Sequence, residues 1–191
     1  METVLLASTS PRRRELLRRM GVPFRARDPR ADERAGLPAA PEEQVLVLAE
    51  RKVRALLPRR GRLRWVLGCD TLVEIDGAVL GKPSGRDEAR DFLARLSGRE
   101  HLVHSGLALY SAAAAAVDVR RATTRVRFRD IGSDEIDWYL ATGEWRAAAG
   151  GYRVQQRAAF FVLSIAGSYT NVVGLPLETF YGMLRTGGYR F

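Results

Sequence analysis

The chain has one cysteine, two histidines and two lysines among its 191 residues. Because Cys69 stands alone, no disulfide can form within the chain, and a reducing compartment is expected. One cysteine and two histidines also make a structural zinc site improbable on ligand number. No apolar run reaches the ~18 residues of a membrane span, and the N-terminus does not resemble a signal peptide. We therefore expect a cytoplasmic protein with no membrane partner.

The composition is that of a globular protein in every respect except charge. Hydrophobic residues make up 46% and charged residues 28% of the chain, which are ordinary shares. This length suits one medium domain or two small lobes. The 31 basic residues, nearly all arginine, outnumber 22 acidic ones and leave a net charge of +9. Since arginine content also follows genome composition, the charge alone indicates anionic partners only weakly.

Apolar periodicity and turn residues predict strands alternating with helices, without a repeat or a flexible linker. The Asp76-Gly77 pair predicts a hairpin turn, and the run from Ala112 to Ala116 a hairpin connector. Ser133 is expected to cap a helix. The class is mixed α/β, with two lobes and a cleft between them as one arrangement. Strands are expected at about 3–8, 22–27, 65–74, 100–111, 117–129 and 160–165, the last one buried, and helices at about 11–20, 40–57, 86–95, after 133 and at 177–184.

Three consecutive arginines stand at the start of the first predicted helix. Ser10 is a suitable N-cap and Pro11 suits the first helical position, so Arg12, Arg13 and Arg14 fall in the first turn. Each cation there opposes the helix dipole, at a cost of about 0.3–1 kcal/mol. A bound anion reverses this penalty, because it accepts hydrogen bonds from the free N–H groups and the guanidinium groups. This helix start is therefore a candidate phosphate site.

Polar side chains also interrupt apolar segments further along the chain. Asp70 lies within WVLGCDTLVEI, and a buried carboxylate is costly unless it is paired or binds a metal. It is either a structural aspartate or a general base or magnesium ligand. Lys82, between a glycine and a proline, is either a solvated turn residue or a cation held in a cleft. On position alone, Lys52 reads as a solvated helix residue and Glu33 as a loop carboxylate, whereas Gln155 offers a donor and an acceptor suited to a base edge.

Six segments in register resemble the Maf family of nucleoside triphosphate pyrophosphatases, once named septum-formation inhibitors. They are LASTSPRRRELL, GCDTLV, GKP, LSGREH, TGEW and GSYTNVVGLPL. Because they span nearly the whole chain, the resemblance implies one domain over residues 1–191. It implies an elongated, mixed α/β sheet flanked by helices, with two lobes around a deep cleft as in the ITPases. It also implies a house-cleaning hydrolase that splits nucleoside triphosphates into monophosphate and pyrophosphate, often as a homodimer.

The resemblance further implies a role for particular residues. Asp70 would accept a proton from water and, with Glu33, bind a divalent cation, Mg²⁺ or Mn²⁺. Arg14 falls outside the family pattern and is expected to be solvated. The residues expected to bind the nucleoside triphosphate substrate are Ser8, Arg12, Arg13, Lys52 and Lys82 for the phosphates, and Thr71 and Gln155 for the base.

The identity of the base is less determined than the reaction. Arg12, Thr71 and Gln155 resemble the specificity positions of the branch that acts on dTTP and UTP. A 7-methyl-GTP pyrophosphatase of the same family is one alternative, and a non-catalytic division inhibitor that binds nucleic acid is another. Scattered arginines without interleaved aromatics disfavour nucleic acid. Departures from the family pattern are concentrated in the part of the sequence expected to contact the base. They are Ser105, Trp145, Ala147, Ala148 and Gln156.

Overall fold

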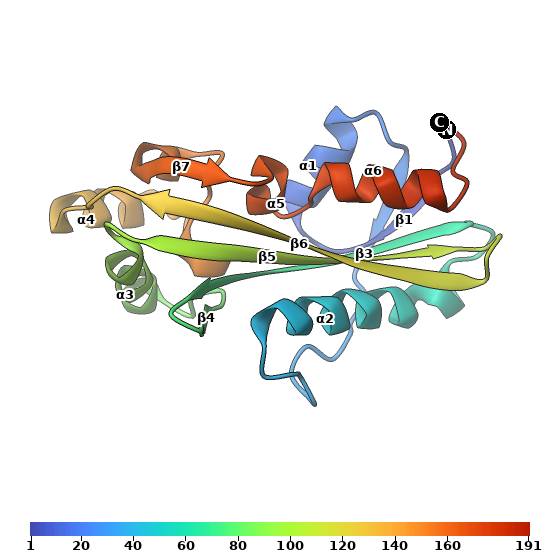
Figure 1. The fold of residues 1–191 in the computed structure, drawn as a ribbon, viewed down its shortest axis with the longest axis horizontal. Coiled ribbons are helices and arrows are strands. Elements are labelled where there is room, and N and C mark those ends of the chain that lie inside the picture. Colours follow the sequence, from blue (N-terminus) through green and yellow to red (C-terminus); the bar gives the residue numbers. More distant parts are fainter. The chain divides into compact units, whose positions relative to one another are not determined.

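The computed structural model describes residues 1–191 and has a mixed α/β fold (Figure 1). None of its helices is both long enough and apolar enough to cross a bilayer. The strands are β1 (Val4–Ala7), β2 (Phe24–Arg27), β3 (Trp65–Ile75), β4 (Ala78–Leu80), β5 (Glu100–Ser111), β6 (Ala116–Phe128) and β7 (Val162–Ala166). The α-helices are α1 (Pro11–Arg19), α2 (Pro41–Leu56), α3 (Arg86–Leu96), α4 (Ser133–Ala141), α5 (Tyr169–Val173) and α6 (Leu177–Thr186).

The seven strands form one mixed sheet in the order β2-β1-β3-β5-β6-β7, with β4 paired to β3. β1 runs parallel to both β2 and β3, whereas β4 is antiparallel to β3 and β7 antiparallel to β6. The chain forms two compact units, and β3, β5 and β6 contribute residues to both. Unit 1 comprises Met1–Asp70, Ser105–Ala122 and Gly174–Phe191, and unit 2 comprises Thr71–His104 and Thr123–Val173.

Unit 1 has apolar packing on both faces of its strands. Successive side chains of a strand point to opposite faces, so neighbours in β1 enter different clusters. Leu6 packs with Leu17 of α1 and Met183 of α6, whereas Leu5 packs with Val53 of α2. Accordingly, Figure 1 shows α2 on one face of β1, and α1 and α6 on the other. Unit 1 is thus a three-layer arrangement in which helices cover a largely parallel edge of the sheet.

Unit 2 is built around aromatic side chains. The ring of Phe128 on β6 lies 4.9 Å from the rings of both His101 and Tyr152, in edge-on contacts. Phe161 links this group to α4, because its ring lies 6.2 Å from Phe128 and 5.5 Å from Tyr139. Edge-on contacts of this kind contribute about 0.5–1.5 kcal/mol each beyond the buried area. The aromatic cluster therefore fixes β5, β6 and α4 to the loop that contains Tyr152.

The mixed α/β class and the predicted order of strands and helices are confirmed. The Asp76-Gly77 turn joins β3 to β4 with Ile75 opposite Ala78, and the alanine run joins β5 to β6. Asp76 has a φ of 51° and Gly77 a φ of 74°, the positive values that a two-residue hairpin of this type requires. Helix α5 was not among the predicted elements.

Three local predictions are wrong, and a fourth is confirmed in position only. Ser133 is the first residue of α4 and Gly132 is its N-cap, with the Gly132 N–H donating to Glu135 at 3.0 Å. Ser10 does stand at the N-cap of α1, as predicted, although its side chain makes no capping hydrogen bond. The segment 160–165 is not a buried strand: β7 begins later, at the sheet edge, and Leu163 is 61% exposed. Arg14 is half-buried rather than solvated, and its Nε atom is buried without a hydrogen-bond partner.

Candidate active site

The turn between β1 and α1 holds several polar groups in a fixed arrangement. Ser8 follows β1 directly and is 5% exposed. Its Oγ accepts hydrogen bonds from the Ser10 N–H at 3.1 Å and from the Arg13 guanidinium at 3.2 Å. The Arg13 Nε–H donates to the Gly174 carbonyl at 2.8 Å, and Arg12 is half-buried. Because the first turn of α1 contains no acidic residue, this helix start is strongly positive and suits an anion.

A buried ammonium group lies between two carboxylates in the same unit. Lys52 of α2 is 5% exposed, and its Nζ lies 2.7 Å from an oxygen of Glu33. The same Nζ donates to Oδ1 of Asp70 on β3, which is 9% exposed. Burying an ammonium costs several kcal/mol unless it is paired, and here two carboxylates supply that pairing. Lys52 is therefore not the solvated helix residue that its position alone suggested.

Two glycines bring α2 close to the sheet and so place Lys52 against Asp70. A Cβ at Gly68 of β3 would lie 2.3 Å from the Ala49 carbonyl oxygen, and one at Gly106 of β5 only 2.0 Å from the Val45 carbonyl oxygen. Neither position accepts a side chain, so the helix backbone rests directly on the strands. No role is predicted for these two glycines from the sequence. Glycine inside an apolar strand pattern is the signal that points to such close approach.

Strand register places the two groups of side chains at one edge of the parallel strands. In the parallel pair of β1 and β3, Ala7 lies opposite Gly68. Ser8 therefore follows the end of β1 at the level where Cys69 and Asp70 continue β3. Ligands of open α/β sheets commonly bind beyond the carboxyl ends of parallel strands. In unit 1, the predicted catalytic carboxylate and the predicted phosphate-binding turn thus share an edge.

Glu33 and Asp70 fit the donor set of a hard divalent cation. Both approach the same Lys52 ammonium, so their oxygens converge on one small volume. The structure gathers no group of three or more His, Cys, Asp or Glu side chains that could hold a metal alone. Mg²⁺ is commonly bound by one or two carboxylates, with substrate phosphates and water completing the shell. Two convergent carboxylates therefore fit a cation that arrives with a phosphorylated substrate.

Three of the nine predicted site residues belong to unit 2. Thr71 of β3 is half-buried, whereas Lys82 and Gln155 are exposed. Lys82 follows β4, and Gln155 lies in a turn after Gly150. The Gly150 N–H donates to the Gly81 carbonyl at 3.0 Å, which connects the backbone beside Lys82 to the loop that carries Gln155. The remaining six predicted residues, Ser8, Arg12, Arg13, Glu33, Lys52 and Asp70, all belong to unit 1.

Several contacts that the sequence did not predict hold the Gln155 loop in place. The Tyr152 hydroxyl lies 2.8 Å from Nε2 of His101. The Arg157 N–H donates to the buried Glu144 carboxylate at 3.0 Å, and the guanidinium of Arg157 pairs with the same carboxylate. Burial raises the pKa of Tyr152, so this hydroxyl keeps its proton, and burial lowers the pKa of His101 to about 4. The loop is thus attached at both ends, before and after Gln155.

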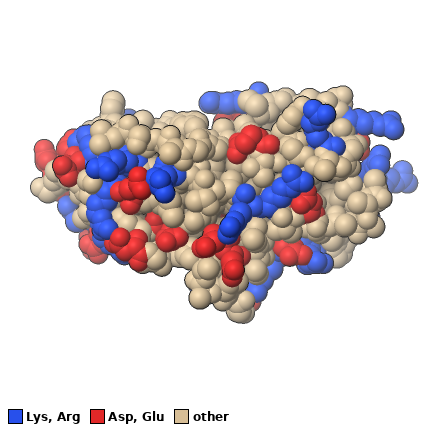
Figure 2. Space-filling view, in the orientation of Figure 1, with Lys and Arg blue, Asp and Glu red and all other residues tan.

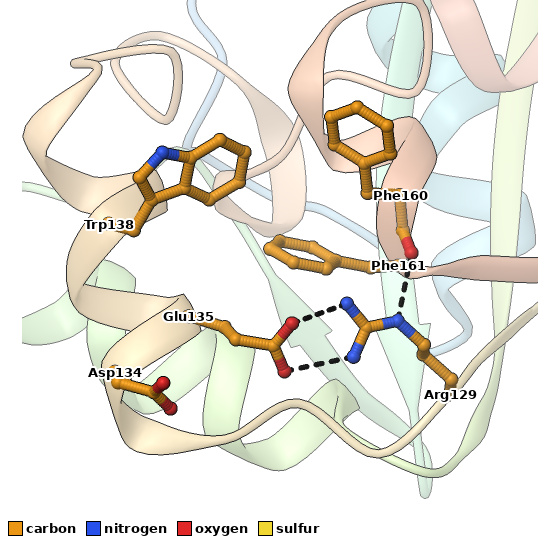
Figure 3. Close-up of a pocket in the computed structure, with 6 residues that line it drawn as sticks. All are labelled: Arg129, Asp134, Glu135, Trp138, Phe160 and Phe161. Atoms are coloured by element: carbon orange, nitrogen blue, oxygen red, sulfur yellow. Dashed lines mark hydrogen bonds and ion pairs between the residues drawn. The ribbon is translucent and has the colours of Figure 1, made fainter.

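A separate cavity of about 490 Å³ lies in unit 2 (Figure 3). Figure 3 shows Arg129 and Glu135 side by side in its wall, joined by two hydrogen bonds of 2.9 and 2.6 Å. The Arg129 hydrogen bonds lower the pKa of Glu135 to about 2. None of the nine predicted site residues lines this cavity, whose walls are Arg129, Asp134, Glu135, Trp138, Phe160 and Phe161.

Comparison with known proteins identifies the family. The family model described as Maf-like protein matches residues 3–187. A relative from Pelotomaculum thermopropionicum, named dTTP/UTP pyrophosphatase, is 44% identical over 191 residues, covering 99% of this chain and 98% of that protein. A relative of the same name from Symbiobacterium thermophilum is 47% identical over 190 residues, covering 99% of this chain and 96% of that protein.

A solved structure shares the fold at much lower identity. The Ham1 protein of Staphylococcus aureus superimposes with a TM-score of 0.53 over 97% of this chain and 99% of that one, at 11% identity. This likeness concerns the fold alone, and it agrees with the mixed α/β architecture. The family match and the relatives, which extend along almost the full length of the sequence, show that this chain belongs to the Maf-like protein family.

Proposed function

We propose that this protein is a nucleoside triphosphate pyrophosphatase that hydrolyses dTTP and UTP to the monophosphate and pyrophosphate. The relatives that carry this activity in their names are 44% and 47% identical to the chain. The single structural observation that carries the proposal is the convergence of Asp70 and Glu33 on Lys52 at the edge where β1 ends. Two acidic groups and a cation beside a positive helix start are the components that hydrolysis of a phosphoanhydride needs.

The Asp70 carboxylate is proposed as the general base. It would accept a proton from the water that attacks the α-phosphorus, a contribution of about 10²–10⁴-fold in rate for a well-placed base. The residue is buried, at 9% exposed, so its carboxylate is largely shielded from bulk solvent. A divalent cation bound by Asp70 and Glu33 would stabilise negative charge on the phosphate oxygens.

The basic residues are proposed to bind the triphosphate. Ser8 and Arg13 are already oriented toward each other by a hydrogen bond, and Arg12 shares their helix start. Negative charge grows on the pyrophosphate leaving group, and cations fixed in advance stabilise that charge without reorganising. Lys52 would complete this set in unit 1. Lys82, on its glycine-proline turn in unit 2, is proposed as a further phosphate-binding residue from the family resemblance.

Thr71 and Gln155 are proposed to contact the base. Gln155 offers a donor and an acceptor, and a pyrimidine edge needs only a few such contacts. The hydrogen bond from Gly150 to Gly81 supports this role, because it ties the Gln155 loop to the backbone next to Lys82. The loop with Gln155 would then contact the base of a nucleotide, and the turn with Lys82, to which this loop is hydrogen-bonded, would contact a phosphate.

The finer properties are proposals from the family resemblance. We propose Mg²⁺ or Mn²⁺ as the cation, the cytoplasm as the compartment, one functional domain over residues 1–191 and a homodimer as the assembly. A role in septum formation is a prediction of the same kind. Each is independent of the reaction itself.

A nucleotide panel tests the proposed function directly. Pyrophosphate release is measured with dTTP, UTP, CTP, ATP, GTP and 7-methyl-GTP, with Mg²⁺ or Mn²⁺ in separate series. We expect release from dTTP and UTP above all others. Preference for 7-methyl-GTP would move the protein to the other branch of the family. Absence of release from every nucleotide, together with salt-sensitive DNA binding, would support the non-catalytic alternative instead.

Figure 2 bears on that last alternative. On the face drawn there, basic and acidic side chains are interspersed. A protein that binds nucleic acid through its surface usually carries its cations along one stripe or patch. This face therefore gives the nucleic-acid alternative no support.

A further inference from the structure

Lys52 is the most deeply buried cation of the proposed site, and its charge partners are unusual. Its Nζ contacts Glu33 at 2.7 Å and also contacts Asp70, so two carboxylates converge on one ammonium group. The side chain of Lys52 is only 7% exposed, whereas that of Glu33 is 48% exposed. The same two carboxylates are the ones proposed to bind the divalent cation. The carboxylate oxygens of Glu33 and Asp70 can therefore bind either the Lys52 ammonium or a divalent metal ion.

We propose that Lys52 occupies the divalent-cation position in the nucleotide-free protein, so that the metal binds firmly only when a triphosphate draws Lys52 away. The inference rests on the proposed function, since it assumes that Glu33 and Asp70 are the metal ligands. In it, Lys52 has two successive partners. The carboxylates hold it in the resting protein, and phosphate oxygens hold it in the complex.

Competition follows from charge and space. An ammonium and a divalent cation repel each other, so both cannot share the convergent oxygens of Glu33 and Asp70. If the metal enters, Lys52 loses partners that offset the cost of its burial. A triphosphate removes this difficulty, because it supplies several oxygens that accept hydrogen bonds from an ammonium.

The structure allows the side chain to change partners while the helix stays fixed. The backbone of α2 packs directly against Gly68 and Gly106, because neither glycine has a Cβ atom to hold the helix away from the sheet. A lysine side chain, however, has a flexible four-carbon stem and a compact charge. Glu33 lies in a loop outside any helix or strand and is half-exposed, so it can also adjust. The exchange needs side-chain rotation, without movement of α2.

This arrangement makes metal and nucleotide binding mutually dependent. The triphosphate draws Lys52 away from the two carboxylates, and the metal binds more tightly once Lys52 has left them. By thermodynamic linkage, if the triphosphate raises the affinity of the protein for metal by some factor, the metal raises its affinity for the triphosphate by the same factor. Free metal would then bind weakly, and the reactive water would be activated only in the presence of substrate.

Direct measurement of Mn²⁺ binding to the nucleotide-free protein tests the inference. Electron paramagnetic resonance of free Mn²⁺ gives the affinity for the wild type and for Lys52→Met. We expect Lys52→Met to bind Mn²⁺ about tenfold more tightly or better, the scale of coupling between close charges. The matched control is Arg54→Met, which removes a positive charge from the exposed face of the same helix, where Arg54 pairs with Glu50. It should leave Mn²⁺ affinity within about twofold of the wild type, because surface ion pairs contribute little.

A second variant and a second readout keep the test decisive. Lys52→Gln retains a polar side chain, and it should also bind Mn²⁺ more tightly than the wild type. In thermal unfolding, Mn²⁺ should raise the melting temperature of both Lys52 variants more than that of the wild type, since ligands that bind only the folded state stabilise it. A variant that is unfolded without metal should regain its circular dichroism spectrum with Mn²⁺, and failure to regain it would count against the inference.

The outcomes separate this inference from the proposed function. If both Lys52 variants bind Mn²⁺ no more tightly than the wild type, while the wild type still releases pyrophosphate, the cation exchange is wrong and the function stands. If the variants bind Mn²⁺ more tightly but the wild type releases no pyrophosphate from any nucleotide, the exchange stands and the function is wrong.

Discussion

At the scale of single residues, burial decides which polar groups can act. His101 of β5 is 2% exposed, and its ring stands edge-on to Phe128 with centroids 4.9 Å apart. Burial lowers its pKa from 6.5 to about 4, so the imidazole is neutral at pH 7. Its Nε2 lies 2.8 Å from the Tyr152 hydroxyl, three residues before Gln155. His101 therefore serves the architecture of the Gln155 loop rather than proton transfer.

The shifted pKa of His101 makes folding depend on pH. Between pH 4 and 6.5 the His101 imidazole is protonated in the unfolded chain but not in the folded protein. The free energy of unfolding is therefore highest above pH 6.5 and falls as the pH is lowered toward 4. The loss reaches about 3 kcal/mol, because each unit of pKa shift corresponds to about 1.4 kcal/mol. We predict that His101→Gln loses this part of the pH dependence. Urea unfolding at several pH values measures it, and an unchanged pH dependence in the variant would show that His101 is not its source.

At the scale of elements, the contact between α2 and the sheet determines the site. Lys52 and Asp70 stand on a helix and a strand, and they meet because Gly68 and Gly106 let the helix backbone rest on the strands. At Gly106, a Cβ would lie 2.0 Å from the Val45 carbonyl oxygen, far inside contact distance. Any side chain there would push α2 outward and carry Lys52 with it.

We predict that Gly106→Ala destabilises the protein by about 1–3 kcal/mol, the usual range for overpacking, and lowers pyrophosphate release as well. Gly85→Ala is the matched control, since Gly85 lies at the N-cap of α3 with nothing within 4 Å of its added Cβ. Denaturant unfolding and turnover are compared for both variants. A Gly106→Ala protein with wild-type stability and turnover would mean that the close approach of α2 is dispensable.

Much of the fold at this scale could be predicted from the sequence. The apolar spacing of Val45, Leu48 and Val53 predicts α2, and the structure places all three in the core. The prediction of a buried strand at 160–165 fails, although a continuous apolar run usually indicates burial on both faces. Here the run includes the exposed Phe160, which lies in a short 3-10 helix, and the exposed Leu163 of β7, which is the edge strand of the sheet. Periodicity carries no information on where in a sheet a strand lies.

The site was less accessible to prediction than the fold. Taken alone, Lys52 looks like a solvated helix residue, and only the packing of α2 on β3 shows that it is buried against Asp70. Lys52 and Glu33 are predicted as site residues by the family resemblance and not by residue spacing. No local pattern predicts that a loop carboxylate and a strand carboxylate converge on one ammonium, because both contacts are long-range.

At the scale of the whole molecule, the net charge belongs to one unit. Unit 1 contains twenty Lys and Arg against eleven Asp and Glu, whereas unit 2 contains eleven of each. The entire net charge of +9 thus lies in the unit that holds Ser8, Arg13, Lys52 and Asp70. Such an excess attracts a triphosphate before any specific contact forms, and the attraction is screened by salt.

We predict that kcat/KM for dTTP falls about tenfold or more as salt rises from about 0.1 M to about 1 M, which shortens the Debye length from about 10 Å to about 3 Å. The value of kcat should change less, because groups in contact with bound substrate are screened little. Steady-state kinetics at constant free Mg²⁺ measure both. A kcat/KM value that does not respond to salt would show that the charge of unit 1 has no part in substrate capture.

The most direct test of the whole account is the product formed from dTTP by the wild type and by Asp70→Asn. The substitution keeps the shape of the side chain and removes the proton acceptor, while Lys52 retains Glu33 as its partner. Asp118→Asn, on β6, is the control for loss of a carboxylate elsewhere in unit 1. We predict equal amounts of dTMP and pyrophosphate from the wild type and the control, and a rate about 10²–10⁴-fold lower for a folded Asp70→Asn. Release of dTDP and phosphate, or normal turnover by Asp70→Asn, would contradict the account.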